Sequence, residues 1–222
     1  TFPAGSIGYI VSEESFFPKN DYLTYLKLRA SIGLVGNDNM SSNRFLYLPD
    51  AYSVNDSGWL QQSYNDKNGY IFGLTNTAYE VAAREIRLGN PNVTWETALK
   101  HNYGVDAYFF KDRLRLSADY FIEKRKDILI QRNTVPLFIA MGGGLLPVVN
   151  MGKVDNKGYE VDLKWSDKVN DFSYYINANV SYSKNKIVYQ DEVEPNEPYQ
   201  WRTGNEVGAR YGYVALGFYN KD

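Results

Sequence analysis

Apolar and polar residues alternate with a period of two along four stretches of this chain. The clearest is KLRASIGL at residues 27–34. Its apolar phase consists of Leu28, Ala30, Ile32 and Leu34, and its other phase of Lys27, Arg29, Ser31 and Gly33. Because successive side chains of a β-strand point to opposite faces, this period predicts strands with one apolar face and one polar face.

The pattern predicts strands along the chain at residues 2–11, 25–35, 93–110, 113–123, 159–165, 172–182 and 211–219. The connections between them alternate in length. We expect tight turns at 111–112 and 166–171. We expect long loops, rich in the turn-forming residues Asn, Asp, Ser and Gly, at 36–91, 126–156 and 188–210. Residues 79–88 of the first long loop are compatible with a helical turn or with an extra strand.

Strands of this kind occur in outer-membrane β-barrels and in soluble antiparallel β-sandwiches. Two features favour the barrel. The strand at 93–110 exceeds the ~5 to 6 residues of a typical soluble strand, and the short and long connections fall on opposite sides of the sheet. Aromatic residues near both strand ends predict two girdles, with Phe109, Phe110, Trp165, Phe172 and Tyr174 in one and Tyr120 and Tyr182 in the other. The predicted fold is all-β, an antiparallel transmembrane β-barrel segment with long extracellular loops.

Composition narrows the function classes. The 222 residues include no Cys and a single His, which leaves little for zinc or thiol chemistry. A net charge of -2 and a pI near 5.6 give no basic surface for nucleic acid. No apolar run reaches the ~18 residues of a membrane-spanning helix, whereas the mean hydropathy of -0.46 suits alternating barrel strands. The first residues do not resemble a signal peptide, so we expect a mature chain or an internal fragment.

Candidate chemical sites are few. The acidic residues Asp191, Glu192, Glu194 and Glu197 could ligate calcium, although such a run is more often a solvated loop. The GGG run at 142–144 lacks the Lys-Ser/Thr of a phosphate-binding loop and indicates loop flexibility. His101 has no Ser or Asp partner at motif spacing, so we interpret it as a strand surface residue. We therefore expect no catalytic residue, no metal site and no cofactor.

Aromatic residues in the long loops are the better binding candidates, and they comprise Tyr47, Tyr52, Trp59, Tyr64, Tyr70, Tyr199 and Trp201. Their flat faces, beside Asp and Asn, would suit sugar rings or peptide side chains. We single out Trp59, Tyr64, Tyr199 and Trp201 as candidate ligand-binding residues. The alternative is that they pack the loops together or contact a partner. Charged residues on the polar face are expected to form a structural network rather than a substrate track, and they are Arg29, Arg113, Arg115, Asp119, Glu160 and Asp162.

Six segments, in order, also resemble one protein family. They are FPAGSIGYIVSEESFF (2–17), LKLRASIGLVGN (26–37), NPNVTWETALKHNYGVDAYFFKDRLRLSADYFIEKRKDIL (90–129), MGKVDNKGYEVDLKW (151–165), FSYYINANVSYSKNKIV (172–188) and RTGNEVGARYGYVALGFYN (202–220). They resemble segments of the SusC/RagA-type TonB-linked outer-membrane transporters of Bacteroidetes. The resemblance implies that residues 1–222 are a single segment from the second half of a plugged barrel of about 22 strands. The plug domain and the closing strands would lie elsewhere.

The resemblance further implies a TonB-dependent nutrient importer in the outer membrane, with no enzymatic activity. Its implied cargo is a glycan or an oligopeptide. Its implied partners are a SusD-like surface lipoprotein, outer-membrane lipid, and the TonB complex through the missing amino-terminal part. Two alternatives remain open: a complete small outer-membrane barrel that serves as an adhesin or a structural protein, and a soluble β-sandwich that binds carbohydrate through Trp59 and Trp201.

Overall fold

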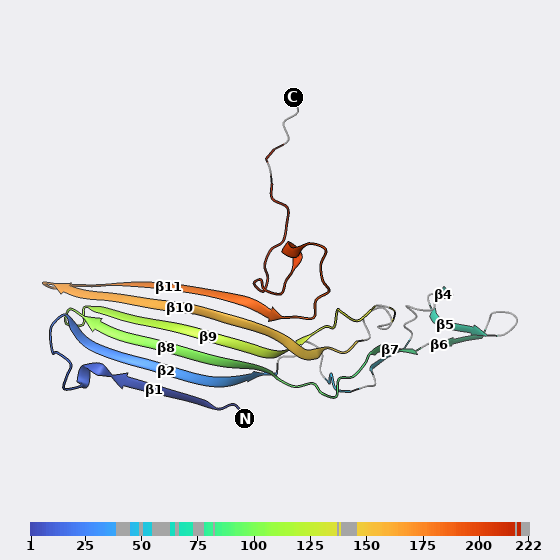
Figure 1. Cartoon of the computed structure of the whole chain (residues 1–222), viewed down its shortest axis with the longest axis horizontal. Helices are drawn as coiled ribbons and strands as arrows, with labels where there is room; N and C mark the ends of the chain where they lie inside the picture. Colours follow the sequence, from blue (N-terminus) through green and yellow to red (C-terminus); the bar gives the residue numbers. More distant parts are fainter. Residues whose placement is uncertain are drawn as a thin grey trace.

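The computed structural model contains one large antiparallel sheet of six strands in the order β1-β2-β8-β9-β10-β11 (Figure 1). Its strands are β1 (Ala4–Ile10), β2 (Leu23–Asn37), β8 (Glu96–Phe109), β9 (Leu114–Ile130), β10 (Val149–Val169) and β11 (Phe172–Tyr189). The structure describes residues 1–38, 45–48, 51–54, 63–64, 67–72, 78–81, 83–136, 138, 146–215 and 217–218, with backbone alone for the strands between 51 and 87. Each strand of this sheet pairs with the sheet strand that precedes or follows it, so the sheet is an up-and-down array.

Two small sheets lie within the connection between β2 and β8. One pairs β3 (Ala51–Val54) with β7 (Ala83–Arg87). The other joins β4 (Ser63–Tyr64), β5 (Lys67–Phe72) and β6 (Ala78–Val81). Within the stretch 79–88, residues 79–81 therefore belong to β6 and residues 83–87 to β7, and not to a helical turn. In Figure 1 these strands extend beyond the large sheet, at the end away from the tight turns.

Short and long connections lie at opposite ends of the large sheet, as predicted. The short end carries residues 11–22, 110–113 and 170–171, and it includes a 3-10 helix η1 (Val11–Glu13). Lys111 fastens two of these turns together, because its amide donates to the Asp21 carbonyl at 3.2 Å and its ammonium pairs with the Asp21 carboxylate at 2.9 Å. The long connections at 38–95, at 131–148 and after residue 189 all leave from the other end.

Strands β9, β10 and β11 extend further than the sequence pattern predicted, whereas β8 is shorter than the strand predicted at 93–110. Strands β8 to β11 contain 14, 17, 21 and 18 residues, more than the ~9 to 11 that cross a bilayer. The predicted turn at 166–171 was wrong, because residues 166–169 pair with 172–175 and only 170–171 form the turn. The predicted loop at 126–156 was too long for the same reason. At both ends of the sheet, the strands therefore continue into segments whose two faces both carry polar residues. Such segments suit a part of the sheet that projects into water.

The predicted strand at 211–219 was also wrong. The described residues 211–215 and 217–218 have no strand structure. In Figure 1 this red segment leads away from the sheet. A strand is stabilised by hydrogen bonds to a neighbour, and no described strand lies alongside this segment.

One face of the large sheet is apolar and carries a row of tyrosines. The register places Tyr103 opposite Tyr120, Tyr120 opposite Tyr159, and Tyr159 opposite Tyr182. The rings of Tyr159 and Tyr182 are 5.7 Å apart. At the short-turn end, the rings of Phe110 and Trp165 are 6.3 Å apart and those of Phe172 and Tyr174 are 6.2 Å apart. The two predicted groups of aromatic residues therefore lie at opposite ends of the apolar face.

The sheet has almost no buried core. Among the described residues, the buried apolar side chains are Leu46, Ala98, Ala107 and Ile187. Large apolar side chains in the sheet remain exposed instead, as for Ile7 at 72% and Val180 at 60%. A β-sandwich buries the apolar faces of two packed sheets, and no described strand covers this face. The sandwich alternative is therefore wrong for this segment. Among the described residues, no helix has the length and apolar character needed to cross a membrane.

Candidate functional site

The polar face of the large sheet carries a cluster of charged side chains, which we call the Arg29 cluster: Arg29, Asp106, Ser117 and Asp119. The Arg29 guanidinium donates from Nε to Asp106 Oδ2 at 2.9 Å and from Nη2 to Asp106 Oδ1 at 3.1 Å. The same Nη2 donates to Asp119 Oδ2 at 2.9 Å. Ser117 Oγ donates to Asp106 Oδ1 at 2.8 Å. The cluster thus joins three adjacent strands, β2, β8 and β9, by charge-assisted hydrogen bonds.

Gly104 makes this cluster possible. It lies on β8 between Arg29 of β2 and Asp119 of β9 in the strand register. A Cβ atom at Gly104 would lie 2.6 Å from Asp119 Oδ1 and 2.7 Å from Arg29 Cζ. The arginine therefore crosses the strand over the one position where no side chain blocks it.

Two acceptor atoms on the polar face remain unused. Asn102 Oδ1 and Asp119 Oδ1 are buried and accept no hydrogen bond from the described residues. Asn102 and Asp119 lie on adjacent strands and on the same face, offset by two residues in the register. Buried polar atoms are normally satisfied, so this part of the face has hydrogen-bonding capacity for a further donor.

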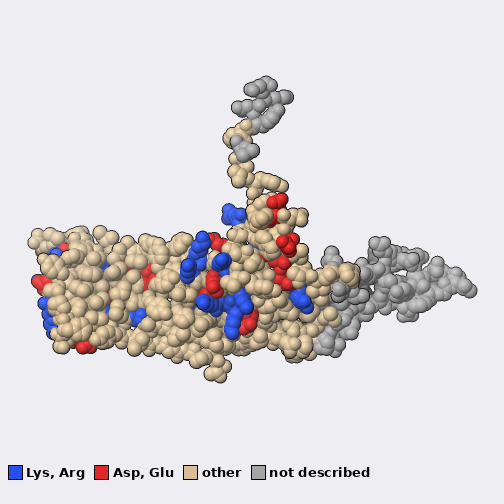
Figure 2. All heavy atoms as spheres, in the orientation of Figure 1, with Lys and Arg blue, Asp and Glu red and all other residues tan. Residues whose placement is uncertain are grey.

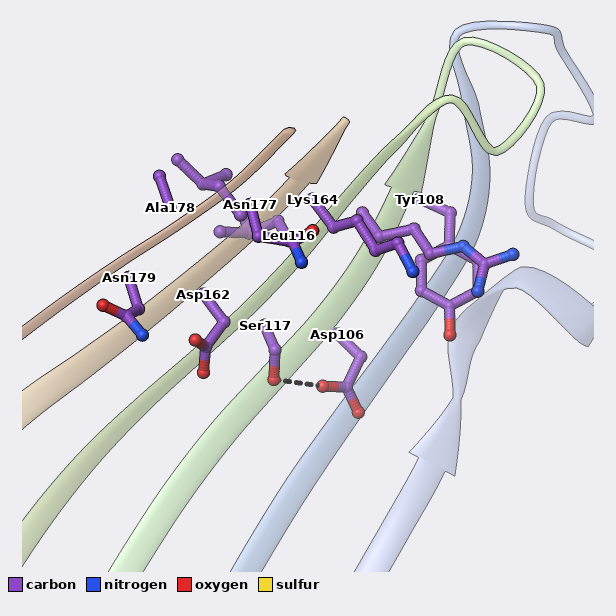
Figure 3. Close-up of a pocket in the computed structure, with 11 residues that line it drawn as sticks. Asp106, Tyr108, Leu116, Ser117, Asp162, Lys164, Asn177, Ala178 and Asn179 are labelled. Atoms are coloured by element: carbon purple, nitrogen blue, oxygen red, sulfur yellow. Dashed lines mark hydrogen bonds between the residues drawn. The ribbon is translucent and has the colours of Figure 1, made fainter. Parts of the chain in front are cut away.

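Beside the cluster, the polar face is hollowed into a shallow depression of about 460 Å³ (Figure 3). Figure 3 shows Asp106 and Ser117 at one side and Asp162 and Asn179 at the other. At the end nearer the short turns, the Arg115 guanidinium stacks over the Tyr108 ring at 4.9 Å. The lining is mainly amide, carboxylate and cationic groups, so the depression suits a hydrated, hydrogen-bonding surface rather than an apolar ligand.

The predicted charge network forms in part. Arg29 and Asp119 meet as described, but Arg113 pairs with Asp167 near the short turns, at 3.3 Å. Glu160 and Asp162 form no ion pair within the described part of the chain. Instead they line a second small hollow on β10 and β11. Arg29, Arg113 and Asp119 therefore connect parts of the sheet through ion pairs, whereas the carboxylates of Glu160 and Asp162 line a hollow on the polar face.

At the long-loop end, hydrogen bonds to Asp191 connect the loop that follows β11 with the loop that follows β9. Its Oδ2 accepts from the backbone amides of Asn133 at 2.6 Å and Thr134 at 3.0 Å, and its Oδ1 accepts from Thr134 Oγ1 at 2.8 Å. The Asn133 side-chain amide donates in return to the Asp191 carbonyl at 3.0 Å. The Thr134 amide contributes most to holding the pKa of Asp191 below its ordinary value, ahead of the opposing effect of burial.

Glu192 joins two parts of the loop that follows β11 by hydrogen bonds. It accepts from the Arg202 amide at 2.7 Å, the Thr203 amide at 2.9 Å and Thr203 Oγ1 at 2.9 Å. Burial acts to raise the pKa of Glu192, but these hydrogen bonds outweigh it and lower the pKa. Asp191 and Glu192 thus act as hydrogen-bond acceptors within the protein. No group of three or more His, Cys, Asp or Glu in the described residues is arranged to hold a metal.

The candidate ligand-binding aromatics that the structure describes are not gathered at one place. Trp59 lies outside the described residues, and Tyr64 belongs to β4. Tyr199 lies in a 3-10 helix η2 (Pro198–Gln200) and is 71% exposed. Trp201 follows it, and its carbonyl accepts from the Tyr211 hydroxyl at 2.9 Å. In Figure 1 β4 stands well apart from the red segment that holds Tyr199 and Trp201, so their role in binding stays a prediction.

His101, the only histidine, lies on the apolar face as a strand surface residue, opposite Ile32 and Ile122. Sequence reasoning missed Gly104, Asp106 and the contact of Asp191 with Asn133. A glycine inside an alternating strand signals a close approach, so Gly104 between Tyr103 and Val105 offered such a signal. Nothing local marks the Asp191 contact, because its partners lie 57 and 58 residues away.

Comparison with known families gives one match over most of the chain. The family model described as "TonB dependent receptor-like, beta-barrel" matches residues 49–220. Two curated relatives come from Formosa agariphila and Bacteroides thetaiotaomicron. TonB-dependent receptor P39 of the former is 29% identical over 100% of this chain and 19% of its own length. TonB-dependent receptor SusC of the latter is 27% identical over 99% and 21%. This chain thus spans about one fifth of the length of these relatives.

Solved structures share the fold. The RagAB peptide importer in its open-open state matches with a TM-score of 0.68 and 22% identity, over 92% of this chain and 20% of that one. The same importer in its closed-closed state matches with a TM-score of 0.64 and 21% identity, over 92% of this chain and 20% of that one. At this identity the likeness supports the arrangement of strands alone.

Proposed function

We propose, because this chain belongs to the family of TonB-dependent receptor-like β-barrels, that it forms part of the wall of an outer-membrane importer. The importer takes up glycans or oligopeptides. In this proposal residues 1–222 form a single segment of the barrel domain, and the plug domain and closing strands belong to other parts of the full protein. The segment itself performs no covalent chemistry.

The observation that carries the proposal is the chemical difference between the two faces of one sheet. On β9 the apolar phase runs from Leu114 to Ile122, close to the ~9 to 11 residues that cross a bilayer. In Figure 2 the visible face of the sheet is mostly tan, and its charged side chains gather in one group beside the C-terminal segment and in a smaller group at the end with the short turns. This face suits lipid, and the opposite face, with the Arg29 cluster and the polar depression, suits a wet lumen.

The polar face has features that would serve a plugged barrel. The Arg29 cluster ties β2, β8 and β9 together from the lumen side. The unused acceptors Asn102 Oδ1 and Asp119 Oδ1 could receive donors of a plug domain. The carboxylates of Glu160 and Asp162 line hollows on the same side. Transport energy would come from the TonB complex acting on the plug.

The long connections would be extracellular, because barrels of this type have short periplasmic turns and long outer loops. A SusD-like lipoprotein would cover this end. The exposed ring of Tyr199 and the nearby Trp201 are candidates for contact with that partner or with cargo. The matched solved structures are described as a peptide importer, which keeps oligopeptides beside glycans as cargo.

The test uses the full-length gene in its own bacterium. We expect the product in the outer-membrane fraction, in a form whose gel migration changes on heating, as for folded barrels. Deletion of the gene should abolish growth on at least one limiting glycan or oligopeptide from a defined panel, and depletion of TonB should have the same effect. A product that remains folded in the aqueous fraction would contradict the proposal.

A further inference from the structure

Four lysines form a cluster on the apolar face, just beyond the tyrosine row on the long-loop side. We call Lys124, Lys157, Lys184 and Lys186 the lysine cluster. Lys157 lies opposite Lys184, and both Lys124 and Lys186 lie one register step further, on either side of Asp155. They share the strand phase of Tyr120, Tyr159 and Tyr182. Figure 2 shows blue side chains gathered over this part of the sheet.

The described residues do not neutralise the lysine cluster. Like charges placed directly opposite on a sheet are destabilising, yet Lys157 and Lys184 face each other in this way. Only Lys184 has an ionic partner, Glu206 at 3.5 Å, and both side chains are more than half exposed. Within the described part of the chain, Lys124, Lys157 and Lys186 form no ion pair.

Charges on the opposite, polar face behave differently at the same height. Lys100 pairs there with Glu123 at 3.7 Å, and Arg125 pairs with Glu96. At this level of the sheet, Lys100 and Arg125 on the polar face are thus each paired with a carboxylate. On the apolar face four lysines gather around two described carboxylates, Asp155 between Lys124 and Lys186 in the register and Glu206 beside Lys184, which leaves an excess of positive charge.

The lysine cluster also borders a hollow of about 610 Å³. Its floor includes Lys157, Lys184 and Lys186, and one wall is the segment around Asn205 and Glu206. That segment is held against β11 by hydrogen bonds between the backbones of Ile187 and Asn205 at 2.8 Å and of Gly204 and Ile187 at 2.8 Å. The hollow thus lies between the sheet edge and a segment that is hydrogen-bonded to it, with room for a polar group.

We propose that the lysine cluster binds the phosphate groups of lipids in the outer leaflet. This rests on the proposed function, which places the apolar face in the membrane and the long loops outside. Tyrosines of a barrel girdle lie at headgroup level. Lys157 and Lys184 lie two residues beyond Tyr159 and Tyr182, about 7 Å further along the strand, and Lys124 and Lys186 lie four residues beyond Tyr120 and Tyr182, about 14 Å further. Ammonium groups at that height meet phosphates, which lysine binds as a point charge.

An acidic surface of a protein partner is the competing ligand. Position favours the lipid, because the cluster continues directly from the apolar face and shares its outward direction. A protein bound from above would instead meet the ends of the long loops. The two ligands differ in what they require, since lipid binding needs no second protein.

The experiment measures lipid retained by the full-length protein in a neutral detergent. Phosphatidylglycerol, whose headgroup carries one net negative charge, is titrated and bound lipid is counted by native mass spectrometry, with phosphatidylcholine as the uncharged comparison. The test variant is the triple K157Q/K184Q/K186Q. The control is K27Q/K100Q/K164Q, which removes the same charge from the polar face. Each lysine near a surface contributes roughly fivefold in affinity, so the test variant should bind phosphatidylglycerol about 100-fold more weakly, and the control unchanged.

Equal retention of the two lipids by the wild-type protein, or equal losses in both variants, would overturn the proposal. Competition by 10 mM inorganic phosphate, without preference for the lipid, would assign the cluster to free phosphate instead. Lysine-dependent capture of the SusD-like partner in the absence of lipid would assign it to protein. Heat-modified gel migration reports folding, and the salt dependence of wild-type binding tests the idea if the triple variant does not fold. Outer-membrane location and uptake are measured separately, so failure here leaves the proposed function standing.

Discussion

Arg29 and Asp119 form an ion pair at 2.9 Å although their strands, β2 and β9, are not neighbours. The guanidinium passes over β8 at Gly104, which has no side chain to obstruct it. A single glycine in the middle of a strand thus allows a charge network to span three strands.

Gly104→Ala should destabilise the full-length barrel by roughly 1–3 kcal/mol, the usual range for overpacking. The added methyl group would overlap both Asp119 Oδ1 and the guanidinium of Arg29, which must then separate. The free energy of unfolding in guanidinium chloride measures the effect. Gly5→Ala is the matched control, because a Cβ at Gly5 meets nothing within 4 Å. Equal stability of the two variants would show that Gly104 has no such role.

Substitution by arginine should lower the free energy of unfolding strongly at one position of β11 and little at the next. Val180 lies opposite Val161, which lies opposite Ala118 at the middle of the apolar phase. Val180→Arg should cost ~2–4 kcal/mol, the penalty for a charge on the lipid side near the midplane. Ser181→Arg, one residue away, points to the polar side opposite Glu160 and should cost little. Unfolding of both variants in lipid gives the comparison, and similar penalties at the two positions would argue against a lipid-facing side.

Removing the Asp191 carboxylate should release the loop that contains Asn133 and Thr134. Asp191→Ala leaves their amides without the acceptor they use now, so hydrogen exchange at these two amides should become at least tenfold faster. Glu194→Ala removes an exposed carboxylate from the loop that contains Asp191 and should leave the exchange of the Asn133 and Thr134 amides unchanged. If both variants exchanged at the wild-type rate, the two loops would be held together by other contacts.

The same contact should depend on pH. Hydrogen bonds from Thr134 and Asn133 lower the pKa of Asp191 in the folded state, so the contact is fully stabilising above the ordinary Asp pKa of about 4. Its contribution should fade as the pH drops below about 4 and through the folded pKa. Protection factors of the Thr134 amide between pH 6 and pH 3 measure this. Constant protection across that range, or the same decline in Asp191→Ala, would count against the assignment.

Tyr199 should contribute to binding without contributing to stability. It is 71% exposed, so Tyr199→Ala should leave the unfolding free energy unchanged while it weakens binding of partner or cargo by about tenfold. Tyr213→Ala, at a tyrosine that is fully exposed, serves as the control in the same binding assay. Equal binding by the two variants would remove Tyr199 from the candidate site.

The period of two was sufficient to predict the central part of each long strand. It placed Leu28, Val161 and Val180 on one face, and the structure confirms this register. The ends of β9, β10 and β11 were not predicted, because the alternation of apolar and polar residues stops where these strands extend beyond the apolar face. Ser166 to Lys168 are polar in succession, as a turn would be, yet they pair with Ser173 to Tyr175.

Contacts between residues that are distant in the sequence limit how much of the candidate site can be predicted. Opposite charges on facing strands were enough to predict that Arg29 and Asp119 belong to one network. The sequence does not reveal that Arg115 stacks on Tyr108, or that Arg113 pairs with Asp167, because these choices depend on register and side-chain reach. The segment at 211–219 has the alternation of a strand, but strand structure depends on a neighbour that the alternation does not supply.

The central claim is that one face of this sheet contacts lipid and the other contacts water. The chain contains no cysteine, so single cysteines along β11 report each position separately. Ala178→Cys, Val180→Cys and Tyr182→Cys should resist a charged, membrane-impermeant maleimide in intact lipid, whereas Asn177→Cys, Asn179→Cys and Ser181→Cys should react through the wet lumen. An alternating pattern of labelling is the predicted result. Uniform labelling of all six positions would contradict the account.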